Sequence, residues 1–137
     1  MQKKIIHYAM LLCLLPFLLI GCSSGKEQQQ EQQYETDFTV CSEENLPKEL
    51  KQLVNEKKEK PFKLSYSTKE YTYIAVGYGE QTMGGYSIQV KELYETKNMV
   101  VVETTLKGPK PSEEKKGVSY PYLVVKMQNS EKPISFR

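Results

Sequence analysis

Four glycines within nine positions, flanked by two strand-like runs, constrain this chain more than any other feature. They are Gly77, Gly79, Gly84 and Gly85. Because glycine adopts positive φ without steric cost, such a cluster is typical of a tight connection of fixed shape. Residues 71–76 are apolar on both faces, and residues 86–94 begin by alternating apolar and polar side chains. The pattern predicts two β-strands joined by a structured loop. An ordinary hairpin, in which the glycines serve backbone geometry alone, is the alternative.

Residues 37–137 are expected to form a single globular domain. Residues 42–60 carry apolar side chains at helical spacing and predict one amphipathic helix, whereas every signal after Pro61 is β. The segment 108–121, rich in proline, glycine and charge, predicts a long exposed loop. The expected fold class is α+β and predominantly β, an antiparallel sheet or sandwich of about six strands with the N-terminal helix packed on it. The expected strands are 37–41, 62–67, 71–76, 86–94, 99–107, 122–127 and 134–136, with a bulge near Lys91 and Glu92.

The N-terminal segment predicts export and lipid anchoring. A short basic start is followed by the apolar run 5–20, which suits a secretory signal better than a membrane span. The stretch Leu19-Ile20-Gly21-Cys22 resembles the bacterial lipobox, which implies cleavage between Gly21 and Cys22 and a diacylglyceryl group on Cys22. We therefore expect a signal peptide over 1–21 and a protein held at the outward face of the cytoplasmic membrane, or at an outer membrane. An uncleaved anchor helix is the alternative.

A glutamine-rich segment follows the expected anchor. Residues 22–36 contain almost no apolar side chains and cannot bury enough surface to fold alone. They are expected to be a disordered tether, with a polar helix as the alternative.

The inventory of reactive side chains argues against catalysis. His7 is the only histidine and lies in the expected signal peptide, and Asp37 is the only aspartate. Neither a Ser-His-Asp nor a Cys-His arrangement can be assembled after position 21, although a pair of glutamates stays possible. No cofactor and no metal are expected. Residues 22–137 carry 17 basic and 17 acidic side chains, so a nucleic-acid partner is not expected either. Cys41 has no partner if Cys22 is acylated and should lie buried beside the helix, with a reactive or intermolecular thiol as the alternative.

Three stretches of the C-terminal part carry a family resemblance. They are Tyr-Ile-Ala-Val-Gly-Tyr-Gly at 73–79, Thr-Met-Gly-Gly-Tyr-Ser-Ile at 82–88 and Tyr-Pro-Tyr-Leu-Val-Val-Lys at 120–126. Together they resemble the family named for PrcB, a lipoprotein subunit of a bacterial surface protease complex, over residues 71–136. The resemblance implies an accessory subunit that supports a subtilisin-like protease without cleaving anything itself. It carries no catalytic residue over to this chain.

The expected function is a non-enzymatic, lipid-anchored, extracytoplasmic protein-binding module, and the resemblance implies that it is an accessory or stabilising subunit of a surface protease. A chagasin-like protease inhibitor that uses the 80–86 loop is the second hypothesis, and a small-ligand carrier or an enzyme is the third. Loop tips on a rigid sheet are common recognition sites. The candidate partner-binding residues are Gly77, Tyr78, Gly79, Glu80, Gln81, Thr82, Met83, Gly84, Gly85 and Tyr86.

Overall fold

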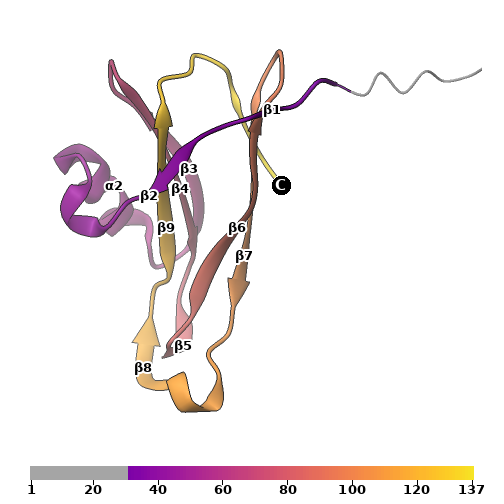
Figure 1. The fold of residues 1–137 in the computed structure, drawn as a ribbon. Helices are drawn as coiled ribbons and strands as arrows, with labels where there is room; N and C mark the ends of the chain where they lie inside the picture. The colour runs from indigo at the N-terminus through magenta and orange to yellow at the C-terminus, as the bar shows by residue number, and fades with distance from the viewer. Residues whose placement is uncertain (1–30) are drawn as a thin grey trace, which may run out of the picture. The chain divides into compact units, whose positions relative to one another are not determined.

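The computed structural model describes residues 31–137, which form one folded unit from Glu31 to Arg137 (Figure 1). The expected signal peptide, its cleavage site at Gly21 and the expected anchor Cys22 lie outside the described residues. The elements are β1 (Tyr34–Glu35), β2 (Phe38–Val40), η1 (Glu43–Asn45), α2 (Lys48–Lys57), β3 (Pro61–Ser67), β4 (Tyr71–Tyr78), β5 (Gln81–Gly84), β6 (Ser87–Glu95), β7 (Val100–Lys107), η2 (Pro111–Glu113), β8 (Lys115–Ser119), β9 (Tyr122–Gln128) and β10 (Ile134–Phe136).

Two four-stranded sheets pack face to face. Their strand orders are β1-β6-β7-β10 and β2-β9-β4-β3, and we call them sheet A and sheet B. All neighbours are antiparallel except β10, which runs parallel to β7. Buried side chains from both sheets meet between them: Leu93, Val100 and Val102 from sheet A, and Ile74, Val125 and Met127 from sheet B. The predicted fold class is confirmed in outline, as a predominantly β structure rich in antiparallel pairing.

The described residues contain ten strands, more than the expected count of about six. Short strands account for the excess, and β1, β5 and β8 were not expected at all. Each of these strands is held by backbone pairing to a neighbour, which needs no apolar alternation in the strand itself. The expected bulge is confirmed, because the register between β6 and β7 shifts between Val90 and Glu92.

Helix α2 packs against the outer face of sheet B. Leu50 and Val54 are fully buried in a cluster with Tyr73, Ala75 and Val124. The helix spans 48–57, so the predicted range of 42–60 was too long. Residues before a proline are driven out of the α region, and Leu46, which precedes Pro47, is extended, with φ −79° and ψ 142°. Within residues 31–137, no helix is both long enough and apolar enough to cross a membrane.

Strand β4 contributes to both apolar layers. Ile74 faces sheet A, whereas Tyr73 and Ala75 face the helix. It pairs with β3 on one side and with β9 on the other. The expectation that residues 71–76 form a central strand is confirmed.

Two predicted irregular segments contain regular structure. Tyr34 and Glu35, expected in the disordered tether, pair with Tyr94 and Glu95 of β6, so the folded unit begins before residue 37. The expected loop 108–121 contains η2 and β8, and β8 pairs with β5. Both segments are polar and lack the apolar alternation that predicts a strand, although each pairs with a neighbouring strand through its backbone.

Gly77 leaves room for an aromatic ring from the neighbouring strand. It pairs with Phe62 of β3, and a Cβ built at Gly77 would overlap the Phe62 ring. Its φ is not positive, so the close approach of this ring, and not backbone conformation, explains the glycine.

Cys41 follows β2 and packs, half-buried, against the apolar cluster under α2. Burial raises the pKa of its thiol above the usual value, and the nearby Lys126 opposes this only in part. The thiol is therefore less ionised, and a weaker nucleophile, than an exposed cysteine. The structure thus favours the expected position beside the helix.

Replacing Gly77 by Ala should destabilise the fold by about 1–3 kcal/mol, because Phe62 has to move to admit the methyl group. Gly108→Ala is the matched control, since a Cβ there meets nothing closer than 3.8 Å, and it should shift stability by less than about 0.5 kcal/mol. Urea unfolding of both variants measures the difference. Equal stability of the two variants would show that the packing of the Phe62 ring does not require a glycine at position 77.

Alkylation of Cys41 by iodoacetamide at mildly alkaline pH should be slower in the folded chain than in the same chain in urea. The reason is that burial raises the pKa and so lowers the thiolate fraction of the folded state. Mass spectrometry of the peptide that contains Cys41 follows this site alone. Equal rates in the two states would contradict a buried thiol.

Candidate functional site

The glycine-rich stretch leaves sheet B through a left-handed turn. Gly79 has φ +74°, and a Cβ there would lie 2.8 Å from Cδ of Pro61. The backbone N–H of Glu80 donates to the carbonyl of Glu59 at 3.2 Å, and the N–H of Tyr78 donates to the carbonyl of Pro121 at 3.0 Å. These contacts fix the direction in which the chain departs from β4.

Beyond the turn, the chain forms a two-stranded ribbon. Strand β5 pairs antiparallel with β8, with a register shift between Gln81 and Met83, and we call this pair the β5–β8 ribbon. The hydroxyl of Ser119 donates to the carbonyl of Met83 at 2.6 Å. The ribbon lies at the lower end of the sandwich in Figure 1. The predicted structured connection between the two strands therefore contains a strand of its own, β5, and the pairing of β5 with β8 was not expected.

Gly85 closes the ribbon against the segment that leads to β8. Its φ is +93°, and a Cβ there would overlap the carbonyl oxygen of Glu113 and lie 2.9 Å from Cβ of Pro109. Gly84 is less constrained, since a Cβ there would lie 3.0 Å from Cβ of Lys115. The structure thus gives Gly79 and Gly85 conformational roles, and Gly77 and Gly84 packing roles.

Two of the predicted partner-binding side chains, those of Tyr78 and Gln81, form hydrogen bonds within the chain. The hydroxyls of Tyr78 and Thr104 share a hydrogen bond of 2.7 Å that joins the two sheets. The side chain of Gln81 donates to the carbonyl of Tyr78 at 3.3 Å. Because these groups already have partners, they are less available to another protein than the sequence suggested.

Glu80 accepts a hydrogen bond of 3.4 Å from the hydroxyl of Tyr120. Partial desolvation, together with the charges of Glu80 and Glu59, raises the pKa of Tyr120. The phenol therefore stays protonated and acts as a donor in this pair at neutral pH. The pair links the turn after β4 to the residue that follows β8.

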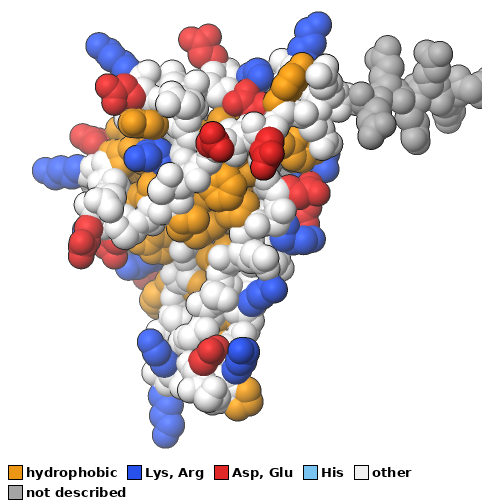
Figure 2. Space-filling view, in the orientation of Figure 1, with side chains coloured by type: hydrophobic (Ala, Val, Ile, Leu, Met, Phe, Trp, Pro, Cys, Tyr) orange, Lys and Arg blue, Asp and Glu red, His pale blue; other side chains and the backbone are white. Residues whose placement is uncertain are grey.

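The remaining predicted residues differ in exposure. Thr82 is exposed, whereas Met83 and Tyr86 are partly buried. Strand β8 adds Lys116 and Val118 to the exposed surface of the ribbon, and Val118 is 55% exposed. The sequence analysis missed these two residues; the only signal for them is the short Val-Ser-Tyr run at 118–120. In Figure 2 the lower end carries charged side chains of both signs, and a small hydrophobic area lies at its lower right edge.

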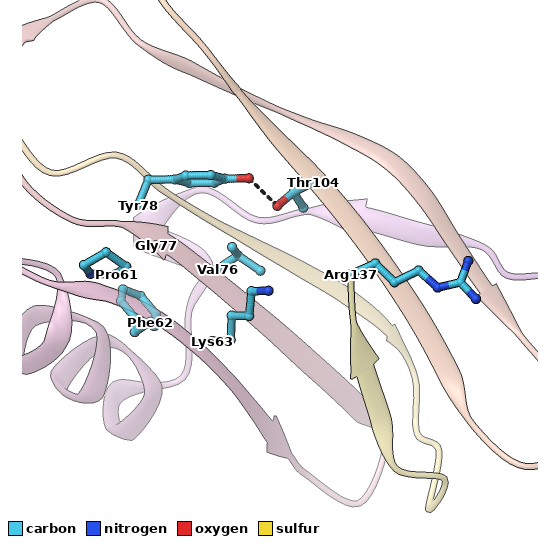
Figure 3. A pocket seen from close by; sticks show the side chains of 8 residues that line it. All are labelled: Pro61, Phe62, Lys63, Val76, Gly77, Tyr78, Thr104 and Arg137. Atoms are coloured by element: carbon cyan, nitrogen blue, oxygen red, sulfur yellow. Dashed lines mark hydrogen bonds between the residues drawn. The ribbon is translucent and has the colours of Figure 1, made fainter.

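A cleft lies between the two sheets at the end of β4 (Figure 3). Its volume is about 520 Å³, within the usual range for ligand sites. Two of the predicted residues, Gly77 and Tyr78, line it, so the structure divides the predicted site into a cleft and a ribbon. The lining residues are Pro61, Phe62, Lys63, Val76, Gly77, Tyr78, Thr104 and Arg137.

The side chains of residues 31–137 offer no ready metal centre. No group of three or more His, Cys, Asp or Glu side chains lies close enough together there to hold an ion. The side chains that line the cleft are apolar, hydroxyl-bearing or basic, and none of them is acidic.

Comparison with known proteins gives one match. The family model described as PrcB C-terminal matches residues 72–128, which run from the beginning of β4 to the end of β9 and include both strands of the ribbon. No curated protein and no solved structure matches the chain. The match is shorter than the expected 71–136 and leaves out α2, β3 and β10. For residues 72–128 it confirms the resemblance to the PrcB family that the sequence predicted.

Proposed function

We propose that this protein is a non-enzymatic, lipid-anchored binding module that serves as an accessory or stabilising subunit of a surface protease. The observation that carries the proposal is the β5–β8 ribbon. Its backbone is held by strand pairing and a hydrogen bond, but it contributes no side chain to either apolar core. None of its residues belongs to the two buried clusters. A segment built in this way is better explained by contact with another molecule than by the stability of its own fold.

The ribbon combines fixed geometry with exposed side chains. The Ser119–Met83 hydrogen bond and the positive-φ residue Gly85 hold its backbone. Thr82 and Val118 are exposed on it. A rigid surface of this kind loses little conformational entropy on association, which favours binding.

The family match supports an accessory role. Both strands of the ribbon lie inside the matched residues 72–128. The family takes its name from a subunit of a surface protease complex, which makes a secreted or surface protease the partner that we propose. The chain has no histidine after position 7. This fits a complex in which the protease, and not this chain, carries out the catalysis.

The inhibitor hypothesis has less support than the accessory role. A chagasin-like inhibitor would insert a protruding loop over residues 80–86 into a protease cleft. Residues 81–84 are instead strand β5, paired with β8. The segment therefore presents one side of a ribbon, and we do not pursue this function.

The anchor that we propose is the diacylglyceryl group on Cys22. Only eight residues separate Cys22 from Glu31, the first residue of the folded unit. The linker is thus short enough to keep the sandwich close to the lipid surface.

A photo-cross-linking amino acid at Thr82 should attach a secreted or surface protease on intact cells, because this side chain is exposed on the ribbon. The matched control is the same amino acid at Thr39, an exposed position on β2. Identification of the attached proteins by mass spectrometry compares the two sites. Val118→Ser should reduce cross-linking from position 82 at least about threefold without unfolding the chain, since surface substitutions change stability by less than about 0.5 kcal/mol. The same partners from both sites, or none from position 82, would contradict a ribbon interface.

Cys22→Ser should release the protein from the membrane fraction, because the variant cannot be acylated. Wild-type chain should stay with the membrane and yield an N-terminal peptide that carries acyl chains, as two chains anchor stably. Cell fractionation with mass spectrometry of that peptide measures both. A wild-type chain without lipid would contradict the anchor, whatever the result of the cross-linking.

A further inference from the structure

We propose that the free edge of β7 and the adjoining cleft bind an extended acidic segment of a partner protein, which adds to sheet A as a parallel strand and places a glutamate in the cleft. This deepens the proposed function, on which it rests, by naming the kind of segment that is bound. It concerns a surface separate from the exposed side of the ribbon.

Strand β10 covers only the first part of β7. Its register pairs Ile134 with Val100 and Phe136 with Val102. In the described chain, no strand lies beside the rest of β7 on this side, because β10 is the last strand of sheet A. Residues 103–107 of β7 therefore form an open strand edge.

The backbone of β7 is oriented to accept another strand there. The N–H of Val100 donates to Pro133, and the carbonyl of Val102 accepts from the N–H of Arg137, both at 3.0 Å. Backbone groups that face one neighbour recur at every second residue of a strand. Thr104 and Leu106 continue this series beyond the end of β10. Their N–H and carbonyl groups are the ones that an added strand would pair with.

The cleft lies where a side chain of the added strand would enter. Ile134 and Phe136 of β10 pack into the space between the sheets. Alternate side chains of a strand point to the same face. An added parallel strand that continues in line with β10 would therefore place a further side chain in this space. Val76 pairs with Lys63 and therefore shares its face of sheet B. In Figure 3 this pair and the Tyr78–Thr104 hydrogen bond bound the cleft.

The chemistry of the lining favours a carboxylate on an apolar stem. Pro61 and Val76 supply apolar walls, and of the two hydroxyls of Tyr78 and Thr104 one keeps a hydrogen free to donate. Lys63 is exposed, with its ammonium 5.8 Å from the centroid of the Phe136 ring, and no acidic side chain lines the cleft. A glutamate would bring the missing negative charge, and charge-assisted hydrogen bonds are stronger than neutral ones.

The test is titration of residues 22–137, the chain without the expected signal peptide, with the peptide acetyl-Glu-Thr-Val-Ser-amide, followed by NMR. Saturable shifts should centre on the amides of Thr104 and Leu106, and exchange of these two amides should slow because they enter a ladder. The same peptide with Gln in place of Glu should bind at least about threefold more weakly, since it lacks the charge.

Two N-methylated peptides distinguish strand addition from simple filling of the cleft. In the proposed register the N–H of the peptide threonine faces β7, whereas that of the valine faces away. Methylation of the threonine nitrogen should abolish binding, and methylation of the valine nitrogen should leave it within about twofold. Equal effects of both methylations would overturn the parallel-strand model.

Lys63→Met should weaken the glutamate peptide and leave the glutamine peptide unchanged. Lys69→Met is the matched control, because Lys69 is exposed in the turn between β3 and β4 and does not line the cleft. Equal effects of the two lysine changes would overturn the assignment of the carboxylate. Self-association of the chain that is lost on addition of the peptide would make a second copy the occupant, and would also overturn the proposal. Val118→Ser should leave peptide binding intact, so failure of the ribbon interface and failure of the cleft are separable results.

Discussion

The burial of β4 on both faces is the constraint on which the rest of this structure depends. Ile74 lies in the core between the sheets, while Tyr73 and Ala75 lie under helix α2. A strand buried on both sides must have apolar residues at successive positions, and it must have a neighbour along each edge so that no backbone group is left unpaired. Strands β3 and β9 meet the second requirement. The family match begins at the start of β4 and ends with β9, so this central strand lies in the part that is similar to the family.

At the end of β4 the chain leaves sheet B and is no longer buried on both faces. Gly77 has no side chain because the Phe62 ring occupies the space, and Gly79 turns the chain out of the sheet with a positive φ. Beyond them, the β5–β8 ribbon is held by backbone pairing and by the Ser119 hydroxyl. The glycines thus do not mark a flexible loop. They allow a short, rigid ribbon to leave a crowded sheet, which separates the residues that hold the core from those that are free to contact another protein.

Much of the fold could be predicted from the sequence, because long apolar patterns report burial directly. The runs at 71–76 and 122–127 correspond to the two strands buried on both faces, and the phase change near Lys91 to the bulge between Val90 and Glu92. What escaped prediction depends on partners distant in the chain. Strand β8 is polar and bonds to β5 through its backbone, and β1 bonds in the same way to the end of β6. The candidate site was predicted only in part for the same reason. Tyr78 and Gln81 look free in the sequence, but Thr104 and the Tyr78 carbonyl engage them in the fold.

Sheet A has an incomplete edge on β7, and this edge adjoins the cleft. Strand β10 pairs with β7 only as far as Val102, and the Tyr78–Thr104 hydrogen bond then joins the sheets where β10 no longer covers β7. A hydroxyl pair closes this gap less completely than apolar side chains would, since it leaves a cleft with a polar wall and Lys63 at its edge. Water can satisfy such groups, and so can a carboxylate, at little cost to the core. Val76 lines the cleft and Gln81 begins the ribbon, so both proposed binding surfaces adjoin the point at which β4 leaves its sheet.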